Sequence, residues 1–127
     1  MVAYRALGIK KPIFIIERLF KDKSINYEFG PKGTGKTEFA LGLANALARG
    51  KPFLDGKYDC PKPYPVLYVD FEMDSYDILE RDIPYQKYYG GDAGDYFQLL
   101  NWELQVEQNI PDIKGEEGQN FILGALE

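Results

Sequence analysis

Residues 30–37 combine the residue types that hold a phosphate group. They read Gly-Pro-Lys-Gly-Thr-Gly-Lys-Thr and match the pattern G-x-x-x-x-G-K-S/T in full. Glycine lets the backbone adopt positive φ, so that successive N–H groups turn toward one anion. The lysine adds a point charge, and the threonine hydroxyl is a ligand for Mg²⁺. The residues predicted to bind nucleotide phosphates are therefore Gly30, Pro31, Lys32, Gly33, Thr34, Gly35, Lys36 and Thr37.

Two acidic residues, Asp70 and Glu72, follow the apolar run at 66–69. In an open parallel sheet, ligands bind beyond the carboxyl ends of the strands. The phosphate loop also follows a predicted strand, so we expect these carboxylates to face it. One would hold a water of the Mg²⁺ ion, and the other would polarise an attacking water. In an alternative interpretation, Asp70 or Asp74 only caps the helix that follows.

The elements that position these residues alternate between strand and helix patterns. Odd-numbered apolar residues alternate with polar ones over 24–29, which predicts a strand before the loop. A helix beginning at residue 36 is apolar over most of its circumference and stops at Gly50, so it should be buried. The other predicted elements are a short helix over 12–20, a buried parallel strand over 66–69, helices over 75–85 and 115–127, and a strand over 97–100. This order predicts an α/β fold with a parallel sheet of about three strands flanked by helices.

Composition excludes several other chemistries. The 127 residues contain no histidine and a single cysteine, Cys60, so histidine-based catalysis, a disulfide framework and a zinc cluster are ruled out. Without a base to activate it, Cys60 should be inert. The formal net charge of −5 disfavours a dedicated nucleic-acid-binding surface. We identify no membrane span and no signal peptide, which predicts a cytoplasmic protein without a membrane partner.

Residues 25–82 resemble the RecA-like P-loop ATPases, particularly the hexameric replicative-helicase-like and RepA-like proteins grouped among the AAA-type ATPases. The resemblance is carried by residues 30–37, by the end of the alanine-rich helix with its extension at 48–54, and by 66–73. It implies a partial RecA-like P-loop NTPase fold that uses ATP and Mg²⁺, with DNA as a partner and a homo-oligomer as the complete form. Glu72 matches the position of the family's water-activating glutamate. We therefore assign Lys36 and Glu72 to catalysis, and Thr37 and Asp70 to the metal.

The resemblance also carries expectations about domain organisation. In this family the Walker B strand follows a further strand and helix, so we expect the domain to be truncated before that strand. Residues 1–23 are expected to form an N-terminal arm and the short helix, and residues 24–127 the N-terminal portion of the P-loop domain.

The expected function is that of a RecA/RepA-like ATPase, whose complete form couples Mg-ATP hydrolysis to helicase-type work on DNA. Two other functions stay open. One is a nucleotide-binding module without turnover. The other is a nucleotide-kinase-type phosphotransferase, which the four arginines of the chain serve poorly because such enzymes need an arginine-rich lid.

Overall fold

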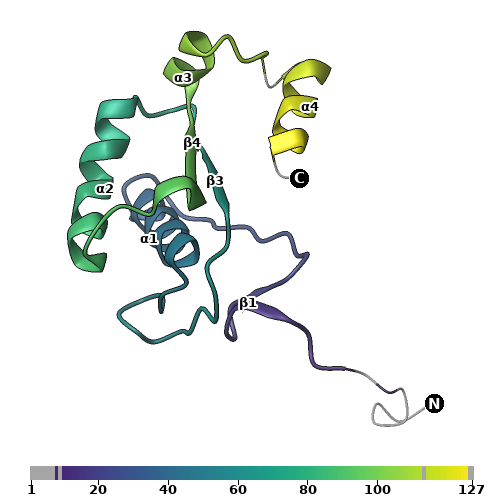
Figure 1. Cartoon of the computed structure of the whole chain (residues 1–127), viewed down its shortest axis with the longest axis vertical. Coiled ribbons are helices and arrows are strands. Elements are labelled where there is room, and N and C mark those ends of the chain that lie inside the picture. The colour runs from purple at the N-terminus through teal and green to yellow at the C-terminus, as the bar shows by residue number, and fades with distance from the viewer. Residues whose placement is uncertain (1–7, 9, 113, 126–127) are drawn as a thin grey trace.

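The computed structural model describes residues 8, 10–112 and 114–125 and has an α/β architecture, as predicted (Figure 1). Most of the expected N-terminal arm and the last two residues of the final predicted helix lie outside the described residues. The elements are β1 (Phe14–Ile16), β2 (Phe20–Lys21), α1 (Lys36–Arg49), β3 (Val66–Val69), α2 (Ser75–Tyr89), the 3₁₀ helix η2 (Gly94–Tyr96), β4 (Phe97–Leu100), α3 (Trp102–Glu107) and α4 (Glu116–Ala125).

The parallel sheet has two strands in the described part of the chain, not the three that we predicted. β3 pairs with β4 in register, from Val66 opposite Phe97 to Val69 opposite Leu100. The predicted strand over 24–29 does not form, and Ile25, Tyr27 and Phe29 on its apolar side are 83%, 78% and 87% exposed. An alternating sequence becomes a strand only when another strand accepts its backbone hydrogen bonds, and here no neighbour does so. For the same reason β3 has one open edge and is only partly buried, rather than fully buried as predicted.

The short helix predicted over 12–20 is also wrong. This segment forms the antiparallel pair of β1 and β2, joined by a turn in which Arg18 has a φ of 68°. Its consecutive isoleucines and phenylalanine favour strand, because branched and aromatic side chains fit a pleated surface. The backbone N–H of Glu17 donates to the carbonyl oxygen of Asp59 at 2.8 Å, and Ile16 is fully buried. Tertiary contacts therefore fix the segment as a strand.

Helix α1 is the central element of the fold, and the sequence predicted it correctly. Of its fourteen residues only Glu38 is exposed, in agreement with the expected burial over most of the circumference. It ends at Gly50, whose φ of 61° lets its N–H and that of Lys51 reach the carbonyl oxygens of Leu47 and Ala46. α1 contacts α2, β3 and β4, so it positions both the phosphate loop and the sheet.

The elements after β3 that we predicted have the predicted types, but their bounds differ from the prediction in places. α2 begins after Asp74, whose side chain accepts the N–H of Asp77 at 2.8 Å, and it runs four residues beyond the predicted end despite Pro84 in its interior. Strand β4 has the predicted bounds, and α4 confirms a helix near the end of the chain. Helix α3 was not predicted, because six residues are too few to show a helical period.

The main core lies where α1 meets β1 and the loop after α1. Ile16, Ala46, Phe53 and Cys60 form a buried cluster, so the single cysteine of the chain is a core residue. In Figure 1, α1 and α2 lie on one side of β3 and β4, and α4 lies on the other. The arrangement brings α1 and the carboxyl ends of two parallel strands into one half of the molecule.

Candidate functional site: the loop before α1

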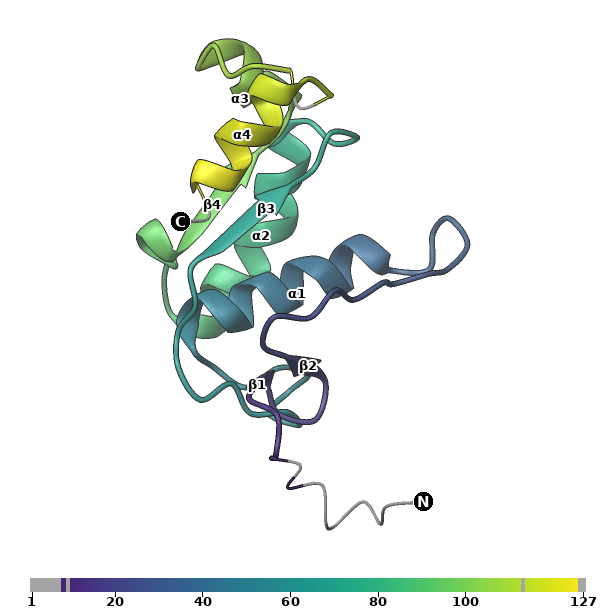
Figure 2. The ribbon, with the colours of Figure 1, turned by 90° about the vertical axis from the view of Figure 1, so that its right-hand side faces the viewer.

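The phosphate-loop sequence forms an irregular, exposed loop that leads directly into α1 (Figure 2). Gly33 and Gly35 have φ angles of 82° and 89°, a conformation that is costly for other residues. Gly35 is the N-cap of α1, and its carbonyl oxygen accepts the N–H of Phe39 at 2.9 Å. Gly30 is favoured for a different reason, because a Cβ there would come within 2.8 Å of the Thr34 hydroxyl oxygen, which would have to shift. The three motif glycines thus meet distinct backbone and steric demands.

Backbone donors are left free at this end of the helix. Within the described residues, the N–H groups of residues 33–37 have no protein acceptor. The first N–H groups of a helix lack intrahelical partners and carry the positive end of its dipole. Free donors at a helix N-terminus favour the binding of an anion.

The Lys36 ammonium lies across the same loop. Its Nζ donates to the carbonyl oxygens of Gly30 at 2.6 Å and of Pro31 at 2.9 Å. The Thr34 hydroxyl also donates to the Pro31 carbonyl oxygen, at 2.7 Å. These bonds hold the loop closed and keep a positive charge beside the free N–H groups. Lys32, in contrast, is exposed and makes no side-chain hydrogen bond in the described part of the chain.

The acidic pair follows the end of β3. The strand ends at Val69 and α2 begins at Ser75, so Asp70 and Glu72 lie in the segment between them and not in the strand itself. One Asp70 carboxylate oxygen accepts the N–H groups of Glu72 at 2.9 Å and Met73 at 3.1 Å, which makes Asp70 a turn-stabilising residue. The Glu72 side chain is exposed. No described hydrogen bond or ion pair joins either residue to the loop at 30–37, and Figure 2 shows the two segments apart.

Tyr68 connects the end of β3 electrostatically with the first turn of α1. Burial first, and then the Asp70 and Glu38 carboxylates, which disfavour a phenolate, together raise its pKa from 10.0 to about 12. Both carboxylates therefore lie near the Tyr68 phenol. Glu38 lies in the first turn of α1, two residues after Lys36.

A polar cluster that the sequence did not reveal follows β4. Asn101 is fully buried; its Oδ1 accepts the Leu104 N–H at 3.0 Å, and its Nδ2 donates to the Ser75 hydroxyl at 2.8 Å. The Ser75 N–H donates in turn to the Glu103 carboxylate at 3.0 Å. An asparagine between a strand and a helix is a recognisable N-cap signal, and it could have predicted α3. The cluster fastens the carboxyl ends of β3 and β4 together.

No group of three or more cysteine, aspartate or glutamate side chains comes together among the described residues in a way that would hold a metal ion. Burial raises the pKa of Cys60, which keeps its thiol protonated and unreactive. A metal at this site would therefore need phosphate oxygens as further ligands, which is how Mg²⁺ commonly binds. None of the described helices has the length and apolar character needed to cross a membrane.

The fold and the loop define a class of protein, a nucleotide-binding domain of the P-loop type. Residues 9–110 match the family model described as the AAA domain, which is more than half of the chain. The chain therefore belongs to the AAA domain family, whose members are ATPase-type nucleotide-binding domains. Comparison with curated proteins and with solved structures finds no match to this chain.

Proposed function

We propose that this chain binds Mg-ATP at residues 30–37, and that it serves a RecA/RepA-like ATPase that couples hydrolysis to work on DNA. The observation that carries the nucleotide proposal is the set of free N–H groups at residues 33–37 beside the Lys36 ammonium. A polyphosphate supplies the acceptors and the negative charge that this surface lacks. The work on DNA is supported by the resemblance over residues 25–82, and family membership supports the ATPase class.

The donor set also fits a magnesium ion bound together with ATP. Thr37, in the first turn of α1, would offer its hydroxyl oxygen to the metal. When bound, Mg-ATP supplies the γ-phosphoryl group and neutralises part of its charge. Lys36 would exchange its two carbonyl acceptors for phosphate oxygens, and the N–H groups of the loop would hold the triphosphate in place. Asp70 would act on the metal through the carboxylate oxygen that the turn leaves free.

Glu72 is proposed as the residue that positions the attacking water. It follows the carboxyl end of a parallel strand, and its side chain is exposed and available. Replacing Glu72 with glutamine removes the base but keeps the size of the side chain. We expect Glu72→Gln to bind ATP as the parent does and to lose turnover by at least about a hundredfold, the range of a general base. Undiminished turnover would assign the base to another residue.

A nucleotide-binding module without turnover is a second candidate, favoured because no described hydrogen bond or ion pair joins the Glu72 side chain to the loop at 30–37. An assay of phosphate release with ATP, in the presence and absence of single-stranded DNA, distinguishes the alternatives. Release stimulated by DNA supports the proposed ATPase. Binding without release supports the module. Transfer of phosphate to a nucleoside monophosphate would identify a kinase-type enzyme and contradict both.

A further inference from the structure

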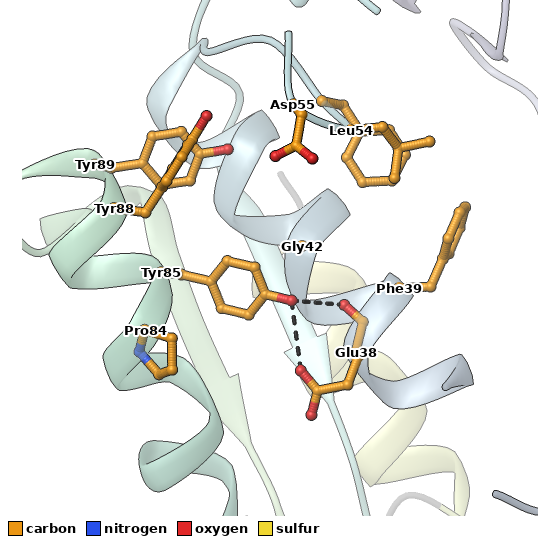
Figure 3. A pocket seen from close by; sticks show the side chains of 10 residues that line it. Glu38, Phe39, Gly42, Leu54, Asp55, Pro84, Tyr85, Tyr88 and Tyr89 are labelled. Atoms are coloured by element: carbon orange, nitrogen blue, oxygen red, sulfur yellow. Dashed lines mark hydrogen bonds between the residues drawn. The ribbon is translucent and has the colours of Figure 1, made fainter. Parts of the chain in front are cut away.

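A pocket of about 400 Å³, separate from the phosphate loop, lies between α1, α2 and the turn after Phe53 (Figure 3). Its volume lies within the range of small-molecule sites. Five aromatic side chains line it, and three of them come from the last two turns of α2. They are Phe39, Phe53, Tyr85, Tyr88 and Tyr89. So many rings in one pocket provide several negative π faces to a ligand.

The charged groups of this pocket are acidic. The Glu38 and Asp55 carboxylates line it, and no lysine or arginine does. Glu38 pairs with Arg81 at 3.2 Å, but both side chains are about half exposed, so solvent weakens this pair. Asp55 has no ion pair among the described residues. The pocket therefore combines aromatic faces with one carboxylate, Asp55, that has no ion pair in the described part of the chain, and a second, Glu38, whose ion pair is exposed to solvent.

Glycine at position 42 keeps the pocket open. A Cβ there would lie 3.4 Å from the Tyr85 hydroxyl oxygen and 3.6 Å from a ring carbon of Phe53, so a larger side chain would fill the space between these rings. Tyr85 is held in place because its hydroxyl donates to the Glu38 carbonyl oxygen at 2.9 Å, as Figure 3 shows. The position of the Tyr85 ring in the pocket is thus fixed before any ligand enters.

We propose that this pocket binds a small organic cation, an alkylammonium or guanidinium group on a short apolar stem. Cations are attracted to aromatic faces within about 6 Å of the ring centroid. The chain already contains one such contact at the same group of rings, since the Arg49 guanidinium carbon lies 5.0 Å from the Tyr89 ring centroid. The two carboxylates add long-range attraction, and the rings provide the apolar surface for the stem.

The test is titration calorimetry of the full chain with choline, with ethylguanidinium, and with dimethylbutanol, the uncharged carbon isostere of choline. If the pocket selects for charge, at least one of the two cations binds at least about tenfold more tightly than the isostere. Equal affinity for all three compounds, or no binding of either cation, would overturn the proposal.

Two variants connect the binding to this pocket. Tyr88 is 67% exposed, so Tyr88→Ala removes a ring with little effect on folding, and we expect cation affinity to fall about fivefold. Gly42→Leu should abolish binding by filling the cavity. Tyr76 is the matched control, because it lies on the same helix, is 70% exposed and does not line the pocket. A loss with Tyr76→Ala equal to that with Tyr88→Ala would contradict the assignment.

The cation site and the nucleotide site are tested independently. Lys36→Ala should leave cation affinity unchanged, because Lys36 does not line this pocket, and Tyr88→Ala should leave ATP affinity unchanged. Failure of nucleotide binding would therefore not count against the cation pocket. Loss of cation binding in Lys36→Ala would overturn the separate site.

Discussion

Lys36 is the residue on which the proposed chemistry depends most. Its ammonium donates hydrogen bonds to two carbonyl oxygens of its own loop, at 2.6 and 2.9 Å. These bonds hold the charge in position before a ligand arrives. The residue types and spacing of the loop were enough to predict its place directly before α1. The relation of the loop to Asp70 and Glu72 was not predictable, because it depends on how a turn after β3 is closed by the Asp70 side chain.

Replacing Lys36 with alanine should weaken ATP binding by about a hundredfold or more. Hydrogen bonds to charged groups contribute roughly 1.5–3 kcal/mol each, and the ammonium would make more than one to a triphosphate. Lys32→Ala is the matched control, because it removes a loop lysine that makes no side-chain hydrogen bond in the described structure. Calorimetry measures both affinities. An unchanged affinity for Lys36→Ala would refute the loop assignment.

Tyr68 should make the protein less stable in strong alkali. The unfolded chain ionises this phenol near pH 10, whereas the folded protein holds its proton up to about pH 12. Because the pKa is raised in the folded state, the stabilisation is complete below pH 10 and is lost as the pH rises through 12. After allowance for solvent screening, the loss is about 1 kcal/mol. In urea unfolding between pH 10 and pH 12, the free energy of unfolding should decline less in Tyr68→Phe than in the parent. An equal decline in both proteins would be evidence against the raised pKa of Tyr68.

Among the elements, those whose signals are local were predicted correctly. α1 has an apolar surface, a glycine N-cap and a glycine stop within its own sequence, and it forms with the expected bounds. The segments at 12–20 and 24–29 were predicted wrongly, because their conformation is decided by partners elsewhere in the chain. Ile16 lies in a strand because it packs on α1. Tyr27 does not, because no strand in the described part of the chain lies beside it.

The two helix-ending glycines allow a matched test of element stability. Gly50 and Gly90 both have positive φ after a helix, at 61° and 80°. A Cβ on Gly90 meets nothing within 4 Å, whereas a Cβ on Gly50 would come within 2.5 Å of the Pro63 nitrogen. Gly90→Ala should therefore cost about 1 kcal/mol for its backbone conformation alone. Gly50→Ala should cost about 3 kcal/mol, because a steric clash is added. Equal losses in urea unfolding would show that the loop at 63 yields easily.

At the scale of the whole molecule, the dominant feature is an uncovered apolar face. A groove of about 350 Å³ runs between the segment around Tyr27, α1 and the open side of β3, and its lining is mainly apolar. Ile25 and Phe29, two residues before and after Tyr27, are also highly exposed. Monomeric proteins rarely expose apolar patches of this kind unless a partner covers them. The overall α/β class was predictable from the order of elements, but the width of the sheet was not, because strand patterns do not specify their partners.

The native protein should therefore bind a hydrophobic dye such as ANS under conditions where it is fully folded. The double variant with Tyr27→Ser and Phe29→Ser should lower dye fluorescence by more than half, because it removes two exposed, stacked rings, of which Tyr27 lines the groove. Tyr96→Ser, which changes an exposed tyrosine of η2, should leave the fluorescence unchanged. Native protein that binds no dye would show that this face is covered in solution.

Because β3 pairs with β4 on one edge and is open on the other, its backbone N–H groups should fall into two classes with different rates of hydrogen exchange. The Asp70 N–H donates to the Leu100 carbonyl oxygen, so the amides of Tyr68 and Val66, at two-residue intervals, point toward β4 as well. The amides of Leu67 and Val69 point the other way, where no strand accepts them. Amide protons along this strand should consequently exchange with deuterium slowly and rapidly in alternation. A molecule that docks along the open edge should be detectable because it slows exchange at Leu67 and Val69.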